Sequence, residues 1–290
     1  MTKTEERAYA KLNLSLDVLG TRGDGYHEMR MVMQSISLCD TVSMTLTDSG
    51  EIRVKSNFRF LPSDGRNIAV KAAKAFFAAA GMEERGLNIV LEKKIPVCAG
   101  MGGGSSDAAA VLRGLNRLYD RPFTMEQLED ISRALGSDVP FCVRGGTQLA
   151  TGRGDELKRL TPMPECSVVV CKPGFSISTP ELFRQLGGKK CAVHPDTDGI
   201  IAALEKGELA GIARRMYNVF EDVLPRRYEG IFEIKRRLLD SGAVGTIMTG
   251  TGSAVFGIFD SADAASTARE ELSHRCRDCF LASPSAALEM

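Results

Sequence analysis

A glycine-rich stretch followed by an apolar helix pattern is the strongest chemical signal in this sequence. The stretch reads Pro96-Val97-Cys98-Ala99-Gly100-Met101-Gly102-Gly103-Gly104-Ser105-Ser106. Glycine permits positive φ and a close approach to an anion, and a helix start adds unpaired N–H groups and the positive end of its dipole. The stretch therefore predicts a phosphate site, with a nucleotide phosphate as its natural ligand. A flexible linker is the alternative, and the helix pattern that follows disfavours it.

Spacing excludes two common glycine-rich phosphate loops. A Walker A loop needs Lys and then Ser or Thr after its last glycine, whereas Gly104 is followed by Ser105 and Ser106. A dinucleotide fingerprint read from Gly100 or Gly102 has Ser105 or Asp107 where its third glycine belongs. The protein-kinase signatures His-Arg-Asp and Asp-Phe-Gly are absent from the sequence.

Lys11 and Asn13 are candidates for a polar site on the opening strand. Polar and apolar residues alternate strictly from Lys11 to Val18, which predicts a half-buried strand. Residues two apart on a strand share a face with about 6.5–7 Å between them, so Lys11 and Asn13 project together from the polar side. For Lys11 alone, a solvated strand lysine is the alternative.

Asp138 is predicted to lie in a turn, from which its carboxylate can face a site. Thr124 and Gln127 predict a capping box for a helix over residues 125–135, with Gly136 just beyond its end. Because Val139 precedes a proline, we expect it outside the helical region, which leaves Asp138 in a short non-helical turn. Capping that turn is the alternative role of Asp138.

The elements that must position these residues follow from the apolar pattern. Residues 108–118 carry the helical spacing, with Ser105, Ser106 and Asp107 as N-cap chemistry, and residues 67–81 also predict a helix. Strands are expected over residues 87–91, 167–171 and 254–259, the last preceded by a second glycine-rich stretch, residues 242–253. The glycine-rich segment 145–154 predicts a junction between an N-terminal domain, 1–154, and a C-terminal domain, 155–290.

Composition narrows the class of partner. The chain has 290 residues, 43% of them hydrophobic, and its 37 basic and 37 acidic residues balance. This charge balance disfavours nucleic acid and membrane surfaces as partners, so any basic site must be local. The sequence has neither a leader-like apolar segment nor an 18-residue apolar run, so we expect a cytoplasmic protein. A monomer or a weak homodimer is compatible with this composition.

The eight cysteines do not form a disulfide framework, because they are scattered singly apart from Cys276 and Cys279. His274 beside that pair raises the alternative of zinc, but a closed zinc site needs four ligands and no second Cys/His pair is near in sequence. We expect incidental thiols.

Three motifs in order resemble the GHMP small-molecule kinases, the family named for galactokinase, homoserine kinase, mevalonate kinase and phosphomevalonate kinase. They are the strand around Lys11, the stretch from Pro96 to Ser106 with its helix, and residues 248–253. The resemblance implies an α+β fold of two domains. These would be an N-terminal domain like ribosomal protein S5 domain 2 and a ferredoxin-like C-terminal domain.

Four further segments resemble the members of this family that act on a cytidine diphosphate alcohol. They are residues 8–14, 23–27, 135–141 and 173–180, the last with Phe183. This narrower resemblance implies transfer of the ATP γ-phosphate to the 2-hydroxyl of a methylerythritol unit, in the non-mevalonate route to isoprenoids. Cys98 and Met101 depart mildly from the usual loop residues and leave the glycines intact.

The same resemblance implies roles for single residues. Asp138 would be the base that accepts the hydroxyl proton, and Lys11 would stabilise the transferring phosphoryl group and keep Asp138 ionised. The cytidine end would be recognised by ring stacking and hydrogen bonds to the base edge, with an exposed loop histidine as the alternative for His27. The residues expected to bind this substrate are Asn13, Tyr26, His27, Thr179, Pro180 and Phe183.

ATP as co-substrate and Mg²⁺ also follow from the resemblance, because the metal bridges and neutralises phosphate oxygens. Ser106 is the expected metal contact. Asn67 is implied as an adenine contact, with capping of the helix that begins at Ile68 as its alternative role. The residues expected to bind ATP are Asn67, Pro96, Val97, Cys98, Ala99, Gly100, Met101, Gly102, Gly103, Gly104, Ser105 and Ser106.

Overall fold

A long antiparallel ribbon of two strands forms the spine of the molecule. The computed structural model describes residues 2–187 and 193–289. The ribbon consists of β1, Lys3–Thr21, and β2, His27–Thr47. It belongs to a sheet of order β3-β4-β2-β1-β8, in which β5 also pairs with β2 and with β6. The other strands are β3 (Ile52–Ser56), β4 (Gly86–Glu92), β5 (Thr147–Thr151), β6 (Glu156–Arg159) and β8 (Tyr217–Asn218).

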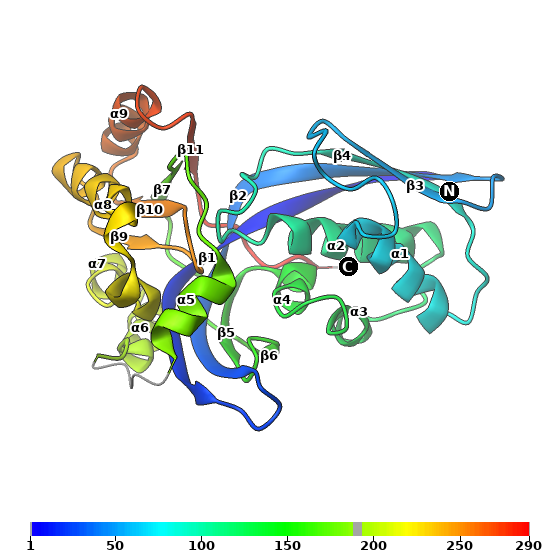
Figure 1. The fold of residues 1–290 in the computed structure, drawn as a ribbon, viewed down its shortest axis with the longest axis horizontal. Coiled ribbons are helices and arrows are strands. Elements are labelled where there is room, and N and C mark those ends of the chain that lie inside the picture. The colour runs from blue at the N-terminus through cyan, green and yellow to red at the C-terminus, as the bar shows by residue number, and fades with distance from the viewer. Residues whose placement is uncertain (1, 188–192, 290) are drawn as a thin grey trace.

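Helices cover one face of this first sheet (Figure 1). They are α1 (Ile68–Ala79), α2 (Gly103–Leu118), α3 (Met125–Ser132) and α4 (Val139–Arg144). The central helix is α2, which packs against α1, α4 and β1 and is buried over most of its length. Because α2 begins at the glycine-rich stretch, this packing fixes the stretch against the sheet.

A second sheet of order β11-β7-β10-β9, antiparallel throughout, forms the other half of the molecule. Its order and its two helices, which follow β7 and β10 in sequence, are those of a ferredoxin-like βαββαβ unit, so the expected α+β fold is confirmed. The strands and these helices are β7 (Ser167–Lys172), β9 (Gly245–Met248), β10 (Val255–Phe259), β11 (Asp278–Ala282), α8 (Gly230–Asp240) and α9 (Ala262–Ser273). Between β7 and α8 lie α5 (Thr179–Leu186), α6 (Thr197–Glu205), α7 (Leu209–Ala213), η1 (Val219–Val223) and η2 (Arg226–Tyr228).

The prediction of a half-buried strand is wrong for residues 11–18, where both faces of β1 are covered. Lys11 and Asn13 are buried, as are Leu12 and Leu14. Leu12 and Leu14 belong to a core cluster that includes Val170 of β7 in the second sheet. A strand placed between two packed units loses the solvent-exposed side that alternation predicts.

Two segments from the second half of the sequence contact the first sheet and its helices. The short β8, from the second half of the sequence, pairs in parallel with β1. After β11 the C-terminal segment runs back to the first unit, and Figure 1 shows the C-terminal end beside α2 and α4. The domain boundary after Gly154 stays a prediction; β6, which begins at Glu156, still pairs with β5 of the first sheet.

Candidate active site

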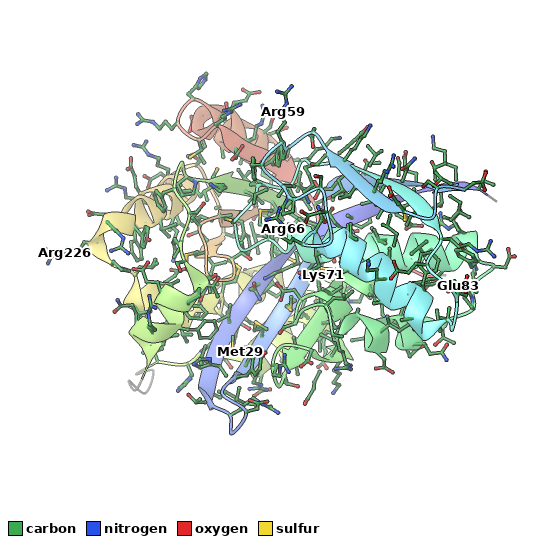
Figure 2. All side chains as sticks on the ribbon, turned by 45° about the vertical axis from the view of Figure 1, so that its right-hand side comes forward. Met29, Arg59, Arg66, Lys71, Glu83 and Arg226 are labelled. Carbon is green, nitrogen blue, oxygen red and sulfur yellow. The ribbon has the colours of Figure 1, made fainter. Side chains whose placement is uncertain are left out.

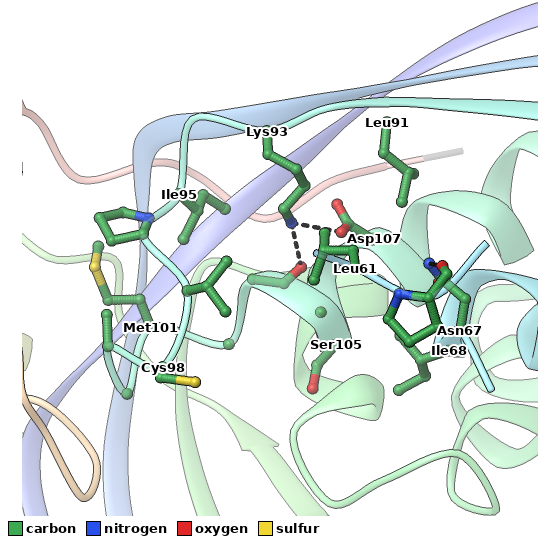
Figure 3. A pocket seen from close by; sticks show the side chains of 18 of the residues that line it. Leu61, Asn67, Ile68, Leu91, Lys93, Ile95, Cys98, Met101, Ser105 and Asp107 are labelled. Carbon is green, nitrogen blue, oxygen red and sulfur yellow. Dashed lines mark hydrogen bonds and ion pairs between the residues drawn. The ribbon is translucent and has the colours of Figure 1, made fainter. Parts of the chain in front are cut away.

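The glycine-rich stretch lines a cavity of about 440 Å³ at the start of α2 (Figure 3), here called the first cavity. Every residue from Pro96 to Ser105 borders this cavity, as does Asn67. Leu61, Ile68 and Leu91 give the cavity an apolar wall, and Arg66, beside the start of α1 in Figure 2, also borders it. An apolar wall next to a helix start suits a nucleoside joined to phosphates.

The helix begins at Gly103, at least three residues earlier than predicted. Its N-cap is Gly102, with φ 69° and ψ 19°, so capping by Ser105, Ser106 and Asp107 is wrong. No side chain caps α2, because the left-handed backbone at Gly102 places glycines in the first turn. The first N–H groups of the helix are therefore left for a ligand to bind.

Ser106 lies away from both cavities described here. Its side chain is buried and its hydroxyl donates to the Tyr9 carbonyl at 2.6 Å. This geometry argues against the expected metal contact through Ser106, because the hydroxyl of this fourth helical residue points toward β1. Ser105 is the serine that borders the first cavity.

Asn67 caps α1 and also borders the first cavity. Its Oδ1 accepts from the Ala69 N–H at 2.9 Å, and its Nδ2 donates to the Pro62 carbonyl at 2.7 Å. Capping, the alternative role, is therefore present in the structure. The adenine contact stays a prediction.

A second cavity, of about 650 Å³, opens on the other side of the glycine-rich stretch. It lies between the β1–β2 ribbon, the start of α4, the start of α5 and residues 250–252. Cys98, Gly100, Gly102 and Ser105 border both cavities. The two spaces therefore meet at the residues expected to hold phosphate.

Lys11 and Asp138 lie together on the wall of the second cavity. Lys11 Nζ is 3.5 Å from Asp138 Oδ2, and the two side chains are 5% and 33% exposed. Asp138 occupies the predicted turn, but Val139 is helical and begins α4, which corrects the expectation for that residue. Pro140 is tolerated there because the first turn of a helix needs no N–H donor from it.

Asn13 is buried beneath the second cavity and does not border it. Its Oδ1 accepts from Lys11 Nζ at 2.8 Å and from the Gly250 N–H at 3.0 Å. The Asn13 N–H donates to Thr249 Oγ1 at 3.1 Å. The expected shared face of Lys11 and Asn13 is confirmed. The geometry argues against direct contact of Asn13 with the substrate. Its hydrogen bonds instead fix the position of Lys11 and of residues 249–250.

Aromatic rings surround the far end of the second cavity. Phe183 borders it, with its ring 4.4 Å from His27 and 4.9 Å from Phe220 between centroids. Tyr26 is half exposed and lies under the Arg153 guanidinium, 3.7 Å from the ring centroid. Phe183 and Arg153 therefore border the cavity. His27 and Tyr26 do not border it and contact these two lining residues instead.

Thr179 and Pro180 border the second cavity from the first turn of α5. Thr179 Oγ1 lies 2.7 Å from Thr251 Oγ1, which joins α5 to residues 248–253, the last of the three family motifs. Arg153, on the loop between β5 and β6, was not singled out in the sequence. A lone arginine in a glycine-rich turn gives no signal until the fold brings it to a cavity.

Comparison with known proteins identifies the family. Residues 67–146 match the GHMP kinases N terminal domain and residues 200–278 match the GHMP kinases C terminal. A 4-diphosphocytidyl-2-C-methyl-D-erythritol kinase of Alkaliphilus metalliredigens is 43% identical, with 94% of each chain covered. The chain belongs to the 4-diphosphocytidyl-2-C-methyl-D-erythritol kinase family, within the GHMP kinases.

Two further comparisons agree with this family. A Bacillus pumilus protein of the same name is 46% identical, with 87% of each chain covered. A crystal structure of a 4-(cytidine 5'-diphospho)-2C-methyl-D-erythritol kinase has a TM-score of 0.82 at 34% identity, and the match covers 98% of this chain and 100% of that chain.

A buried charge cluster in this GHMP kinase lies beneath the first cavity and was missed in the sequence. Lys93 Nζ pairs with Asp40 and Asp107, at 2.5 Å from Asp107 Oδ2, and donates to the Gly103 carbonyl at 3.3 Å. Burial, opposed by the charge of Lys93, raises the pKa of Asp107 to about 7. Single charged residues at strand and helix ends give no periodic signal, so only the fold reveals the cluster.

Within residues 2–187 and 193–289, no group of three or more His, Cys, Asp or Glu side chains is placed to hold a metal ion. Over the same residues, no helix is long and apolar enough to cross a membrane. Cys279 instead lies beside Cys171, with their sulfur atoms 3.1 Å apart.

Proposed function

We propose that this kinase transfers the γ-phosphoryl group of ATP to the 2-hydroxyl of 4-diphosphocytidyl-2-C-methyl-D-erythritol, giving the 2-phosphate and ADP in the non-mevalonate pathway. The observation that carries the proposal is the meeting of two cavities at the glycine-rich stretch, with Lys11 and Asp138 on the acceptor side. The first cavity takes ATP. The second takes the alcohol.

The chain supplies the phosphate site mainly through its backbone. The left-handed Gly102 starts α2, so the N–H groups of Gly103, Gly104 and Ser105 are available to phosphate oxygens. Mg²⁺ fits this site because it needs few protein ligands when phosphates supply the rest, and the Ser105 hydroxyl and Asp138 carboxylate are the oxygens at hand. When bound, Mg²⁺ neutralises phosphate charge.

The transfer step follows from the Lys11–Asp138 pair. Asp138 takes the proton of the acceptor hydroxyl as its oxygen bonds to the γ-phosphorus, and the bond from that phosphorus to the bridging oxygen of ADP breaks. Lys11 donates to the phosphoryl oxygens, on which negative charge remains. Asn13 holds the Lys11 ammonium at 2.8 Å, so the cation is in place before the substrates bind.

The acceptor is held at its cytidine end by the aromatic part of the second cavity. Phe183 offers a ring for stacking, supported by His27 and Phe220 behind it. Arg153 borders the same cavity and lies over the Tyr26 ring, which suits a diphosphate, because a guanidinium can bind two phosphate oxygens at once. Thr179 and Pro180 close the side of this pocket.

The substrate is tested by comparing acceptors in a coupled assay of ADP release. We expect turnover with 4-diphosphocytidyl-2-C-methyl-D-erythritol and little with mevalonate or homoserine. Turnover of either rival with none of the cytidylated alcohol would contradict the substrate. ATP binding without transfer to any of the three would instead favour a nucleotide-binding protein that has lost catalysis.

The base is tested with Asp138→Asn, which keeps the shape of the side chain and removes its capacity to take a proton. We expect kcat to fall by about a hundredfold or more, with the affinity for a non-hydrolysable ATP analogue unchanged within about twofold. Asp130→Asn, at an exposed position on α3, is the matched control and should keep full activity. If Asp138→Asn retains kcat within a few-fold, the assignment of the base is wrong.

A further inference from the structure

Arg113, on the buried side of α2, joins the two elements that carry the proposed catalytic pair. The residue is buried, and its guanidinium contacts main-chain oxygens on both sides. Nη2 donates to the Arg7 carbonyl of β1 at 2.7 Å. Nη1 donates to the Cys142 and Val143 carbonyls of α4, at 2.8 and 3.2 Å. One planar group thus spans from β1 to α4.

The residues whose carbonyls Arg113 contacts lie close in sequence to Lys11 and Asp138. Arg7 precedes Lys11 by four residues on β1. Cys142 follows Asp138 by one helical turn, and its N–H donates to the Asp138 carbonyl at 3.2 Å. Since a single turn of helix is stiff, fixing the C-terminal end of α4 also fixes Asp138 at its start.

The chemistry of Arg113 matches the end of a short helix. The last carbonyls of α4 have no partner within the helix and carry the negative end of its dipole. Arg113 satisfies two of these carbonyls, while the Arg144 carbonyl accepts from the Leu288 N–H at 2.7 Å. Glu6 Oε2, 3.4 Å from Arg113 Nε, balances the buried charge.

We propose that Arg113 is a positioning residue for phosphoryl transfer, which sets the separation of Lys11 and Asp138 by bridging β1 and α4. This proposal rests on the proposed roles of those two residues. Arg113 itself borders neither the first nor the second cavity, so it acts through the elements that it joins. Its loss should affect the transfer step more than nucleotide binding.

The test compares Arg113→Met with Arg117→Met. Arg117 comes from the next turn of α2 and pairs with the same Glu6, at 2.8 Å, but its exposed guanidinium is not hydrogen-bonded to α4. We expect Arg113→Met to lower kcat by about tenfold or more with the KM for ATP within about twofold, and Arg113→Lys to restore part of kcat. Arg117→Met should keep kcat within about twofold.

A double variant separates positioning from general damage. In the Asp138→Asn background, Arg113→Met should lower the residual kcat by no more than about twofold, because the group that it positions is gone. An equal loss in both backgrounds would overturn the proposal, as would folded Arg113→Met with full kcat. If Arg113→Met does not fold, Arg113→Lys and Arg113→Gln decide in the same way. Full activity of Asp138→Asn alone would instead refute the proposed role of Asp138 as the base.

Discussion

At the scale of single residues, two buried lysines flank the start of α2. Lys11 packs on Gly102, where an added Cβ would lie 2.9 Å from its Cγ, and Lys93 lies on the other side, 3.5 Å from the Cβ position of Gly103. Burying a charge is costly unless it is paired, and both lysines are paired: Lys11 with Asp138, and Lys93 with Asp40 and Asp107. The glycines make room for these ammonium groups directly beneath the helix start. The carboxylates balance both ammonium charges, so the preference of the helix start for anions comes from its free N–H groups and its dipole.

Three of the cysteines, Cys98, Cys142 and Cys166, should differ sharply in reactivity. Cys98 is exposed and borders both cavities. Burial raises the pKa of the Cys142 thiol to about 12, and burial raises that of Cys166 to about 12 as well. Alkylation needs the thiolate, which is about one part in ten thousand at pH 8 for such groups. We expect iodoacetamide at pH 8 to modify Cys98 and to leave Cys142 and Cys166 intact, as read by peptide mass spectrometry.

A non-hydrolysable ATP analogue should slow the labelling of Cys98, because the nucleotide would fill the cavity that the thiol borders. Protein unfolded in guanidinium is the control, in which all three thiols should react. Labelling of Cys142 as fast as that of Cys98 in the folded protein would contradict the burial argument. A rate at Cys98 that is insensitive to the analogue would place the nucleotide elsewhere.

At the scale of elements, the site is built where two glycine-rich loops from different halves interlock. Thr249 Oγ1 donates to the Gly100 carbonyl at 3.3 Å, and the Ala254 N–H donates to the Ala99 carbonyl at 3.1 Å. Gly100 has φ 74°, and a Cβ there would overlap the Thr249 carbonyl oxygen. Glycine is therefore required at position 100 for both its conformation and its close approach.

Gly100→Ala should weaken both the fold and the transfer reaction. The left-handed backbone alone costs about 1–2 kcal/mol for alanine, and the overlap with Thr249 forces the two loops apart. We expect a lower midpoint in urea unfolding and a kcat reduced by about tenfold or more. Gly20→Ala, where an added Cβ meets nothing within 4 Å, is the control and should change neither. Unfolding of Gly100→Ala at the wild-type midpoint would contradict the interlock.

Element types were predictable from the sequence where the signal is local. The capping box of Thr124 and Gln127 is present at the start of α3, and the helix over residues 67–81 is confirmed as α1. The start of α2 and the helical state of Val139 were predicted wrongly. The first prediction relied on the preference for serine at helix caps, and the second on the preference against helix before proline. Tertiary packing overrides both preferences, because α2 and α4 are buried against β1.

At the scale of the whole molecule, the site depends on segments far apart in sequence. Lys11, Cys98, Asp138, Thr179 and Thr251 border one cavity. The residue types could be predicted from the motifs, but their convergence depends on how the second sheet packs on β1. Pairing of β8 with β1 and the return of the C-terminal segment have no local sequence signal. For the same reason, neither the buried state of Asn13 nor the bridge made by Arg113 could be predicted.

The C-terminal segment after β11 should act as a strap between the two halves. Ser37 N–H donates to the Ser283 carbonyl at 2.8 Å, Ser285 N–H donates to the Ser35 carbonyl at 2.8 Å, and the Leu288 N–H bonds to α4. At roughly 0.5–1.5 kcal/mol for each hydrogen bond, a chain that ends at Ala282 should lose on the order of 3 kcal/mol of unfolding free energy. We expect a thermal midpoint several degrees lower by calorimetry. A chain that ends at Leu288 keeps these bonds and should have the thermal midpoint of the full chain. Equal midpoints for all three chains would show that the C-terminal segment does not stabilise the contact between the two halves.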